Sequence, residues 1–471
     1  MKATTMDMPD RALRGPASAS LSFGAHVRGT LTLGLPLVGA QLAQMAIHVT
    51  DTIMVGRLGT VELAAAVITA QLFHLVWMLG TGFALAVVPV AASAQGRGDV
   101  RGVRRSVRMG LWVAALYASL LMVPLWFTDP LLVALGQDEE VARLSGIYMR
   151  ILQWALFPAL AVIVFRSFLS VLQRPGVVLT VTIFGVGFNF VVAYAFIYGN
   201  LGMPALGIAG AGVAGLATMA AMAALLAAYS AVGDLARYEV FVRFWRPDWP
   251  GFFEIARLGW PIGLTIVAEA GLFAASSVMI GWFGTRELAA HGIALQLAAI
   301  AFMIPLGLAS AATVRVGLAY GARDAVGVGR AARAAFAVGL TIATCSAILF
   351  WTVPERLIGL YLDLSEPDAA AVLATGVSLL AVGAAFQLVD SGQALASGVL
   401  RGLKDTRVPM IMAIVSYWLI GMPVAYGLAI GAGWGPVGVW WGLAFGLLFA
   451  AGLMTTRFLR REARGRILEG A

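Results

Sequence analysis

The chain has 471 residues, of which 60% are hydrophobic and only 12% are charged, and its mean hydropathy is +0.88. A soluble domain carries about 25% charged residues, so this composition excludes a soluble globular protein and indicates an integral membrane protein. The formal net charge is +8; we interpret it as a signal of membrane topology and expect no nucleic-acid partner.

Twelve apolar stretches are long enough to cross a bilayer, whose core of about 30 Å needs about 20 residues per helix. In chain order they cover residues 30–56, 63–93, 107–128, 145–170, 177–199, 204–232, 258–283, 288–320, 334–353, 372–399, 408–431 and 435–456. Several contain proline, which membrane helices tolerate because neighbouring helices satisfy the freed backbone groups. The sequence therefore predicts an all-α integral membrane protein with twelve transmembrane helices.

The chain contains an internal repeat. Residues 33–99 align without a gap with residues 258–324, at a constant offset of 225. The matches include Leu33, Gly34, Pro36, Met54, Gly56 and Gln71 with Leu258, Gly259, Pro261, Met279, Gly281 and Gln296. Both halves hold six helices and begin on the same side, which makes them parallel repeats. We expect an N-lobe over 30–232 and a C-lobe over 258–456, joined by a cytoplasmic linker at 233–257 and flanked by a tail at 1–29 and a basic tail at 457–471.

The basic residues predict the orientation of the chain. All Lys and Arg residues but five fall on the side of the two termini; the exceptions are Arg57, Arg143, Arg150, Arg286 and Arg356. Because cytoplasmic segments are enriched in Lys and Arg, we expect both termini in the cytoplasm. We expect a multi-pass protein of a bacterial inner membrane.

Three carboxylates, Asp51, Glu269 and Asp390, lie inside apolar stretches. A charge at the centre of a membrane helix costs about 3 kcal/mol, so these acids need a functional explanation. In the aligned repeat Asp51 corresponds to Ser276 and Glu269 to Gln44, and the fold therefore does not require an acid there. We expect no Lys or Arg in mid-membrane to pair with the acids, and we predict that they bind a cation or a proton.

Motifs of enzymes and of ATP-driven pumps are missing from the sequence. The histidines show no HExxH spacing, and there is no GxSxG or GxxxxGK[ST] segment. The single cysteine, Cys345, excludes intramolecular disulfides and cysteine metal clusters. We therefore expect no catalytic activity and no cofactor other than a coupling ion.

Four segments resemble the MATE family of multidrug and toxic compound extrusion transporters. They are Thr50 to Gly56 (TDTIMVG) with Pro36 fifteen residues before Asp51, Glu287 to His291 (ELAAH), Phe302 to Gly307 (FMIPLG) and Leu400 to Met410 (LRGLKDTRVPM). The acids on the seventh and tenth helices make the chain similar to the NorM branch. The resemblance covers residues 30 to about 455. It implies a V-shaped pair of six-helix bundles that exports organic cations in exchange for Na⁺ or H⁺.

The resemblance also implies site residues. Glu269 and Asp390 match the family's cation-binding acids of the C-lobe, with Phe302 as the nearby aromatic residue. Asp51, Asn189 and Thr218 match its polar cluster of the N-lobe. The three carboxylates would be the ligands of a sodium ion, if the coupling ion is Na⁺.

The chain departs from the family at a few of these positions. It has Phe386 where a tyrosine is common, Ala193 where a second polar residue is common, and Gly292 where the family has glutamine. We expect the substrate cavity to include Phe302, Phe386, Gln44 and Gln296, and we expect helix bending at Pro36 and Pro261.

Several functions stay open at this point. Na⁺ and H⁺ are both compatible with buried carboxylates, since a proton needs one acid and a sodium ion needs several hard oxygens. An exporter or flippase of lipid-linked oligosaccharides or metabolites is the alternative, but it would need cationic residues in the cavity to hold a pyrophosphate. A scaffold or passive channel would leave the three acids unexplained. The expected partners are small cationic substrates and membrane lipids, and we expect a monomer.

Overall fold

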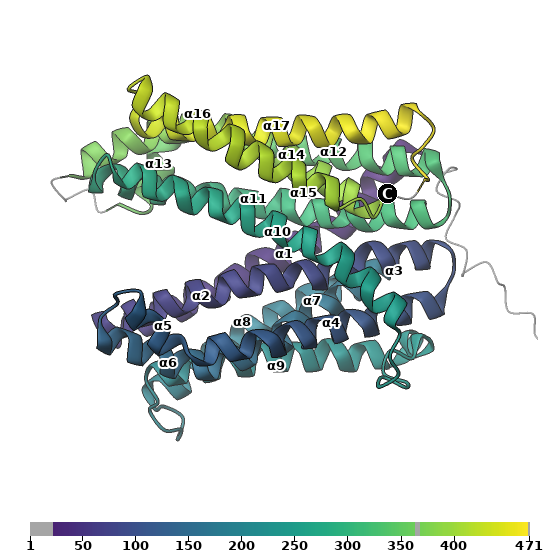
Figure 1. Cartoon of the computed structure of the whole chain (residues 1–471), viewed down its shortest axis with the longest axis horizontal. Helices are drawn as coiled ribbons and strands as arrows, with labels where there is room; N and C mark the ends of the chain where they lie inside the picture. Colours follow the sequence, from purple (N-terminus) through teal and green to yellow (C-terminus); the bar gives the residue numbers. More distant parts are fainter. Residues whose placement is uncertain (1–21, 363–367, 470–471) are drawn as a thin grey trace, which may run out of the picture.

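The computed structural model describes residues 22–362 and 368–469. The remaining parts of the two expected tails, residues 1–21 and 470–471, lie outside the described residues. Within the described part twelve helical spans are long and apolar enough to cross a membrane, which confirms the predicted number. Figure 1 shows them in two bundles, one made of α1 to α9 and the other of α10 to α17.

The first bundle, the N-lobe, holds six spans. They are α1 (Phe23–Gly56), α2 with α3 (Thr60–Leu85 and Val87–Gly96), α4 (Val100–Trp126), α6 with α7 (Glu139–Leu152 and Leu156–Val171), α8 (Pro175–Tyr198) and α9 (Ile208–Ala231). Short helices α5 (Thr128–Ala134) and η4 (Gly233–Tyr238) connect or follow them, and η3 (Gln153–Ala155) joins α6 to α7.

The second bundle, the C-lobe, repeats this order. Its spans are α10 (Trp249–Gly281), α11 (Thr285–Gly321), α12 (Ala325–Thr352), α14 (Ala369–Gly402), a fifth span from Arg407 to Gly431, and α17 (Gly435–Ala463). The fifth span consists of α15 (Arg407–Ile414), η5 (Val415–Gly421), α16 (Met422–Tyr426) and η6 (Gly427–Gly431), and both η5 and η6 are π-helical. The short helix α13 (Pro354–Gly359) follows α12.

Prolines explain where the N-lobe spans are interrupted. Pro89 has no backbone N–H for the carbonyl of Leu85, and α2 ends at that residue. The repeat-related α11 has Val314 at the equivalent position and runs without a break. Both lobes keep the same helix cap, since Asp99 Oδ1 accepts from Gly102 N at 2.9 Å and Asp324 Oδ1 accepts from Gly327 N at 2.8 Å.

Three helices extend beyond the apolar limits seen in the sequence. α1 begins at Phe23 within the expected tail 1–29, α10 begins at Trp249 within the expected linker 233–257, and α17 continues to Ala463 within the expected tail 457–471. Capping explains two of these differences, because Ser22 caps α1 and Asp248 caps α10 through Gly251 N at 3.2 Å. Hydrophobic length marks the part of a helix inside the bilayer, whereas capping residues mark where the helix itself begins.

At the interface between the two lobes, glycines of one lobe lie against residues of the other. The internal repeat relates these contacts to one another two by two. An added Cβ at each of these glycines would collide with the opposite lobe. The pairs are Gly82 with Gly263 and Gly307 with Val38, Gly259 with Phe83 and Gly34 with Leu308, and Gly96 with Leu318 and Gly321 with Ser93. These six pairs form three sets of two. Within each set, adding 225 to the N-lobe residue of one pair and subtracting 225 from its C-lobe residue gives the other pair. We call these contacts the glycine seam.

The glycine seam lies on one side of the molecule. Its members occupy the early parts of α1 and α10, which begin at Phe23 and Trp249, and the later parts of the spans that end at Gly96 and Gly321. These are the halves nearest the described ends of the chain, which we call the terminal half; the other half is the far half. The lobes are thus closely packed in the terminal half, mostly through backbone atoms, where α1 and α10 cross in Figure 1.

Candidate functional site

The N-lobe site is built on Asp51, Asn189, Thr218 and Tyr148, which we call the N-lobe cluster. α1 carries Asp51 and packs against α8, which carries Asn189. The Asp51 carboxylate interacts with the Asn189 side chain and, electrostatically, with Tyr148 on α6. Asn189 and Thr218 are both 0% exposed, so these polar groups lie inside the lobe.

Helix packing places Thr218 opposite Asn189. α8 and α9 are successive spans and therefore run antiparallel, and an added Cβ at Gly185 of α8 would touch Met222 of α9. One turn further along α8 is Asn189, and one turn back along α9 is Thr218. The three residues named by the family resemblance thus gather at one place, together with Tyr148, which the sequence analysis did not include.

Polar atoms of the N-lobe cluster are buried without hydrogen-bond partners. Among the described residues this holds for Asp51 Oδ1, for both Asn189 Oδ1 and Nδ2, and for Thr218 Oγ1. Most buried polar groups in proteins are hydrogen-bonded, so unpaired atoms that converge on one place indicate a binding site. The three oxygens are hard donors of the kind that Na⁺ prefers.

The C-lobe site is built on Glu269 of α10 and Asp390 of α14, which we call the C-lobe pair. The two acids lie close enough to interact electrostatically. The ring contact of Phe273 with Phe386, with centroids 6.0 Å apart, explains this, because the phenylalanines lie one turn from the acids on antiparallel helices. Asp390 is only 2% exposed, and its Oδ1 has no hydrogen-bond partner among the described residues.

Further polar groups that the sequence analysis missed surround the C-lobe pair. Gln387 and Gln393 lie three residues before and after Asp390 on the same face of α14, and both carry buried atoms without partners in the described part of the chain. Tyr417 adds one such hydroxyl and interacts electrostatically with both acids. It belongs to the π-helical segment η5, and π-helical turns occur frequently at functional sites. The spacing of the glutamines was a readable signal, whereas the π-helix was not.

The C-lobe pair has a cationic neighbour. The sequence analysis expected no Lys or Arg in mid-membrane to pair with the acids, and Arg401 instead approaches them from the end of α14, where its guanidinium interacts electrostatically with Glu269 and with Tyr417. Arg401 is the penultimate residue of α14, so its position in the sequence suggested a role in topology alone. Its side chain is half-buried and long enough to extend from the helix end toward the acids.

The four expected cavity residues have different environments. Phe386 is 2% exposed and packs on Trp440 with centroids 5.6 Å apart, so it belongs to the core beside Asp390. Phe302 is half-buried and packs against the C-lobe core. Gln44 and Gln296 are half-buried. The assignment of Phe302, Gln44 and Gln296 to a substrate cavity stays a prediction, and Phe386 is a packing residue of the acid site.

His291 has a structural role in this arrangement. Its Nδ1 accepts from Trp440 Nε1 at 3.1 Å, and its Nε2 lies 2.9 Å from Ser277 Oγ. Ser277 Oγ in turn donates to the carbonyl of Phe273 at 3.0 Å, which leaves the hydroxyl free to accept from His291 Nε2–H. Both ring nitrogens are satisfied, and the histidine ties α10, α11 and α17 together.

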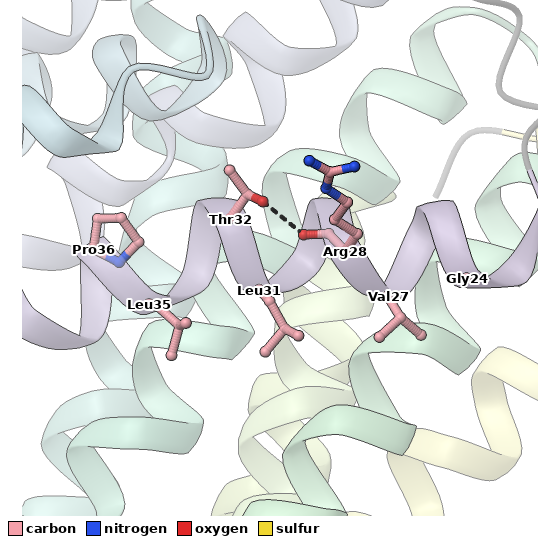
Figure 2. Close-up of a pocket in the computed structure, with 7 residues that line it drawn as sticks. All are labelled: Gly24, Val27, Arg28, Leu31, Thr32, Leu35 and Pro36. Carbon is pink, nitrogen blue, oxygen red and sulfur yellow. Dashed lines mark hydrogen bonds between the residues drawn. The ribbon is translucent and has the colours of Figure 1, made fainter.

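Pro36 and Pro261 lie inside helices that continue through them. Pro261 follows the early part of α10, and its carbonyl accepts from Thr265 Oγ1 at 2.8 Å. Pro36 borders a shallow groove of about 440 Å³ whose lining residues all come from α1, shown in Figure 2. Thr32 Oγ1 donates to the carbonyl of Arg28 at 2.8 Å in the turn before Pro36. Helix bending at the two prolines stays a prediction, and this groove contains none of the three acids.

The fold and the two sites together define a class of protein. Parallel repeats of six membrane helices, each with a polar site inside its bundle, are the architecture of secondary transporters. A sequence model of the family described as MatE matches residues 36–195 and 261–427, one segment in each lobe. The chain belongs to the MatE family, which confirms the resemblance found in its motifs.

Relatives cover almost the whole chain. It is 52% identical over 445 residues to the "Probable multidrug resistance protein NorM" of Rhizobium meliloti (strain 1021), covering 94% of this chain and 95% of the relative. It is 39% identical over 440 residues to a protein of the same name from Pseudomonas aeruginosa, covering 93% and 90%. These relatives confirm the similarity to the NorM branch.

Solved structures share the fold at lower identity. A structure described as "Outward-facing conformation of a multidrug resistance MATE family transporter of the MOP superfamily" matches with a TM-score of 0.84 at 21% identity, covering 98% of this chain and 99% of that chain. The structure "Crystal structure of eukaryotic MATE transporter AtDTX14" matches with a TM-score of 0.82 at 19% identity, covering 94% and 99%. Together with the twelve spans, these structures confirm the all-α fold with two six-helix lobes.

Proposed function

We propose that this chain is a secondary active multidrug efflux antiporter that exports organic cations and amphiphilic drugs in exchange for Na⁺ or H⁺. The names of its relatives support multidrug efflux. The observation that carries the exchange mechanism is the presence of one buried carboxylate site in each lobe, at the N-lobe cluster and at the C-lobe pair. Buried carboxylates of this kind can release one cation when they take up another.

The C-lobe pair supports a one-charge exchange. With both acids ionised, Glu269, Asp390 and Arg401 carry a formal charge of −1, and the three groups lie within electrostatic range of one another through Glu269. One Na⁺, one H⁺ or one monovalent organic cation would neutralise this charge. Two cations competing for a single negative charge is the simplest basis for antiport, because binding of one favours release of the other.

The N-lobe cluster supports ion coordination. Asp51 supplies one negative charge, while Asn189, Thr218 and Tyr148 supply neutral oxygens around it. Oxygen donors without other partners fit a sodium ion, and the carboxylate alone would suffice for a proton. Asp51, Glu269 and Asp390 are therefore the proposed acidic ligands, with Na⁺ or H⁺ as the only coupling species and no further cofactor.

The alternative of an exporter or flippase for lipid-linked oligosaccharides or metabolites has one observation in its favour. Arg401 is a cationic group inside the C-lobe, which the sequence analysis did not expect. However, its partners are Glu269 and Tyr417, and the acids beside it would repel a pyrophosphate. The site therefore favours a cationic substrate over an anionic one.

Orientation and assembly follow from the same physical arguments. We place both termini in the cytoplasm of a bacterium, with the protein in the inner membrane, because the basic residues collect in the terminal half. The glycine seam would then close the cytoplasmic side, and the far half would face outward. We propose a monomer that transports and does not catalyse a covalent reaction.

Ethidium efflux from proteoliposomes tests this function. The purified chain is reconstituted and given an imposed sodium gradient or, separately, an imposed proton gradient, with Asp390→Asn protein in parallel. Efflux driven by one gradient and lost in the variant would support the antiporter and identify its ion. No response to either gradient would contradict cation antiport and favour the alternative exporter.

A further inference from the structure

A groove rich in arginine lies at the terminal end of α17. Its volume is about 420 Å³, and five arginines line it, namely Arg457, Arg460, Arg461, Arg464 and Arg466. Figure 1 shows this end of α17 at the same side of the molecule as the last described residues of the chain. The groove lies far along α17 from the membrane centre and contains none of the residues of the N-lobe cluster or the C-lobe pair.

The groove changes from apolar to cationic along the helix. Leu453 and Met412 line one end, and Leu453 is exposed on the surface of α17. Arg457, Arg460 and Arg464 follow at steps of three or four residues and therefore lie on the same face of the helix. The apolar end belongs to the hydrophobic stretch 435–456, and the cationic end follows directly after it. A ligand that fits must be apolar at one end and anionic at the other.

Two of the arginines are fixed by a buried acid. Asp405, in the connection between α14 and α15, is 2% exposed and accepts from Arg457 Nε at 2.6 Å and from Arg461 Nη1 at 3.0 Å. This acid pre-orders one wall of the groove, because it holds two long side chains in place. An ordered wall loses less side-chain entropy when a ligand binds.

The groove keeps an excess of positive charge. Arg466 lies 3.7 Å from Glu469, which also lines the groove. Among the described residues, Arg460 and Arg464 have no ion pair. Five arginines against Asp405 and Glu469 leave a formal charge of +3. An anion with several oxygens would satisfy Arg460 and Arg464 by charge-assisted hydrogen bonds.

The sixth span of the N-lobe carries no such row of arginines. The corresponding sixth span, α9, contains no Lys or Arg, and the residues after it form η4. Topology alone requires basic residues on this side of the membrane but does not require them to converge in one groove on one lobe. The row of arginines on the sixth span is therefore a feature of the C-lobe, and the repeat does not require it.

We propose that this groove binds an anionic phospholipid. Arg460 and Arg464 would hold the phosphate, and the acyl chains would lie along Leu453 and Met412. Basic pockets between membrane helices on the cytoplasmic side recognise such headgroups. Because Asp405 joins the groove to the connection between α14 and α15, the bound lipid would hold together the two spans that carry Asp390 and Tyr417. This inference is independent of the substrate and of the coupling ion.

Native mass spectrometry of the full-length chain in delipidating detergent tests the proposal. We expect phosphatidylglycerol to bind with at least about tenfold higher affinity than phosphatidylcholine of the same chain length. The double variant Arg460→Gln/Arg464→Gln should lose about 30-fold in affinity for phosphatidylglycerol, given the usual contribution of a basic residue near an anionic lipid. The charge-preserving variant Arg460→Lys/Arg464→Lys should retain most of the affinity.

A matched control separates this groove from charge in general. Arg101 and Arg323 are exposed in the terminal half and lie outside the groove, so Arg101→Gln/Arg323→Gln removes the same charge. Equal lipid affinity in the two double variants would overturn the proposal. A second arm replaces the lipid with inorganic phosphate or glycerol phosphate. Binding of either as tight as that of the lipid would assign the groove to a soluble anion and overturn the assignment to a lipid, whereas an absence of binding supports the acyl-chain contacts.

Discussion

The two lobes share a helix order but surround their acids differently. In the N-lobe, Asp51 is a single carboxylate among neutral groups, Asn189, Thr218 and Tyr148. In the C-lobe, Glu269 and Asp390 form a pair next to Arg401 and Tyr417. A single acid among neutral oxygens suits the coordination of a small ion, whereas a pair of acids with an arginine suits exchange of one positive charge. The repeat has thus kept the scaffold and changed the chemistry.

The largest expected effect comes from the C-lobe pair. Asp390→Asn and, separately, Glu269→Gln should reduce gradient-driven ethidium efflux to the level of protein-free liposomes, because each change removes the charge that the two cations share. Expression and the elution volume in size-exclusion chromatography should be unchanged. The exposed acid Glu139 provides the control, and Glu139→Gln should transport normally. Full export by both C-lobe variants would assign these acids to packing.

A second large effect should come from the glycine seam. Gly82→Ala places a methyl group against the backbone of Gly263, whereas the repeat-related Gly307→Ala places one against Val38. Overpacking costs about 1–3 kcal/mol, so the closed terminal half should lose about tenfold or more in population in Gly82→Ala. Spin labels at positions 101 and 323, in a Cys345→Ala background, report the separation of the lobes.

The comparison between Gly82→Ala and Gly307→Ala tests the seam more specifically than either variant alone. Gly307→Ala should open the terminal half less than Gly82→Ala, because its added methyl group meets a Val38 side-chain methyl at 2.5 Å before the Val38 backbone at 2.8 Å, whereas in Gly82→Ala the backbone of Gly263 is the nearest neighbour. Distance distributions identical to those of the parent protein in both variants would show that the lobes do not separate at the seam.

The N-lobe cluster should control the ion more than the drug. Asn189→Ala removes a buried amide beside Asp51, and we expect the ion concentration for half-maximal efflux to rise about tenfold. The KM for ethidium should change by less than about twofold. Thr180→Ala, an exposed change on the same helix, is the control. If ion dependence is unchanged in Asn189→Ala, then Asn189 serves packing, and the contrast between the lobes loses its functional meaning.

The smallest effect should come from an exposed ion pair of the N-lobe. Arg174 donates to Tyr229 Oη at 2.9 Å and to Asp234 Oδ2 at 3.0 Å, and these two contacts raise the pKa of Arg174. The contribution of Arg174 to this stabilisation is therefore lost as the pH rises through that raised pKa. Asp234 is mostly exposed, so Asp234→Asn should cost less than about 1 kcal/mol of unfolding free energy.

The C-lobe offers the matched comparison for that ion pair. Asp405 is buried between two arginines, and Asp405→Asn should cost about 3 kcal/mol. Denaturant unfolding of the detergent-solubilised variants measures both changes. Equal costs for Asp234→Asn and Asp405→Asn would show that burial does not distinguish the two pairs.

The sequence predicted the fold and the three acids because each produces a strong local signal. Apolar length determines which segments can cross the membrane, and the high cost of Asp51, Glu269 and Asp390 in such segments makes them candidates for a functional role. Asn189 and Thr218 were found only through the resemblance to the family. Their burial next to Asp51 depends on how α1, α8 and α9 pack, which no local pattern encodes.

Most of the site residues that the sequence analysis missed are of a residue type, or at a position, that is equally compatible with a purely structural role. A tyrosine such as Tyr148 is common in the core and at the membrane interface, and Arg401 lies at a helix end where topology alone explains an arginine. Tyr417 reaches the C-lobe pair from a π-helical turn, whose position depends on the neighbouring helices. Gln387 and Gln393 could have been found, because they flank Asp390 at helical spacing.

The glycine seam has a consequence for the cost of moving the lobes. Glycine has no side chain to immobilise, so bringing two backbones together there loses no rotamer freedom, and separating them recovers none. The two arrangements of the lobes can then differ little in free energy, since close backbone contact in lipid contributes mainly van der Waals attraction. The free-energy change when a buried site gains or loses one charge is large compared with this difference. Under the proposed exchange mechanism, a single ion would be enough to set the position of two bundles of six helices each.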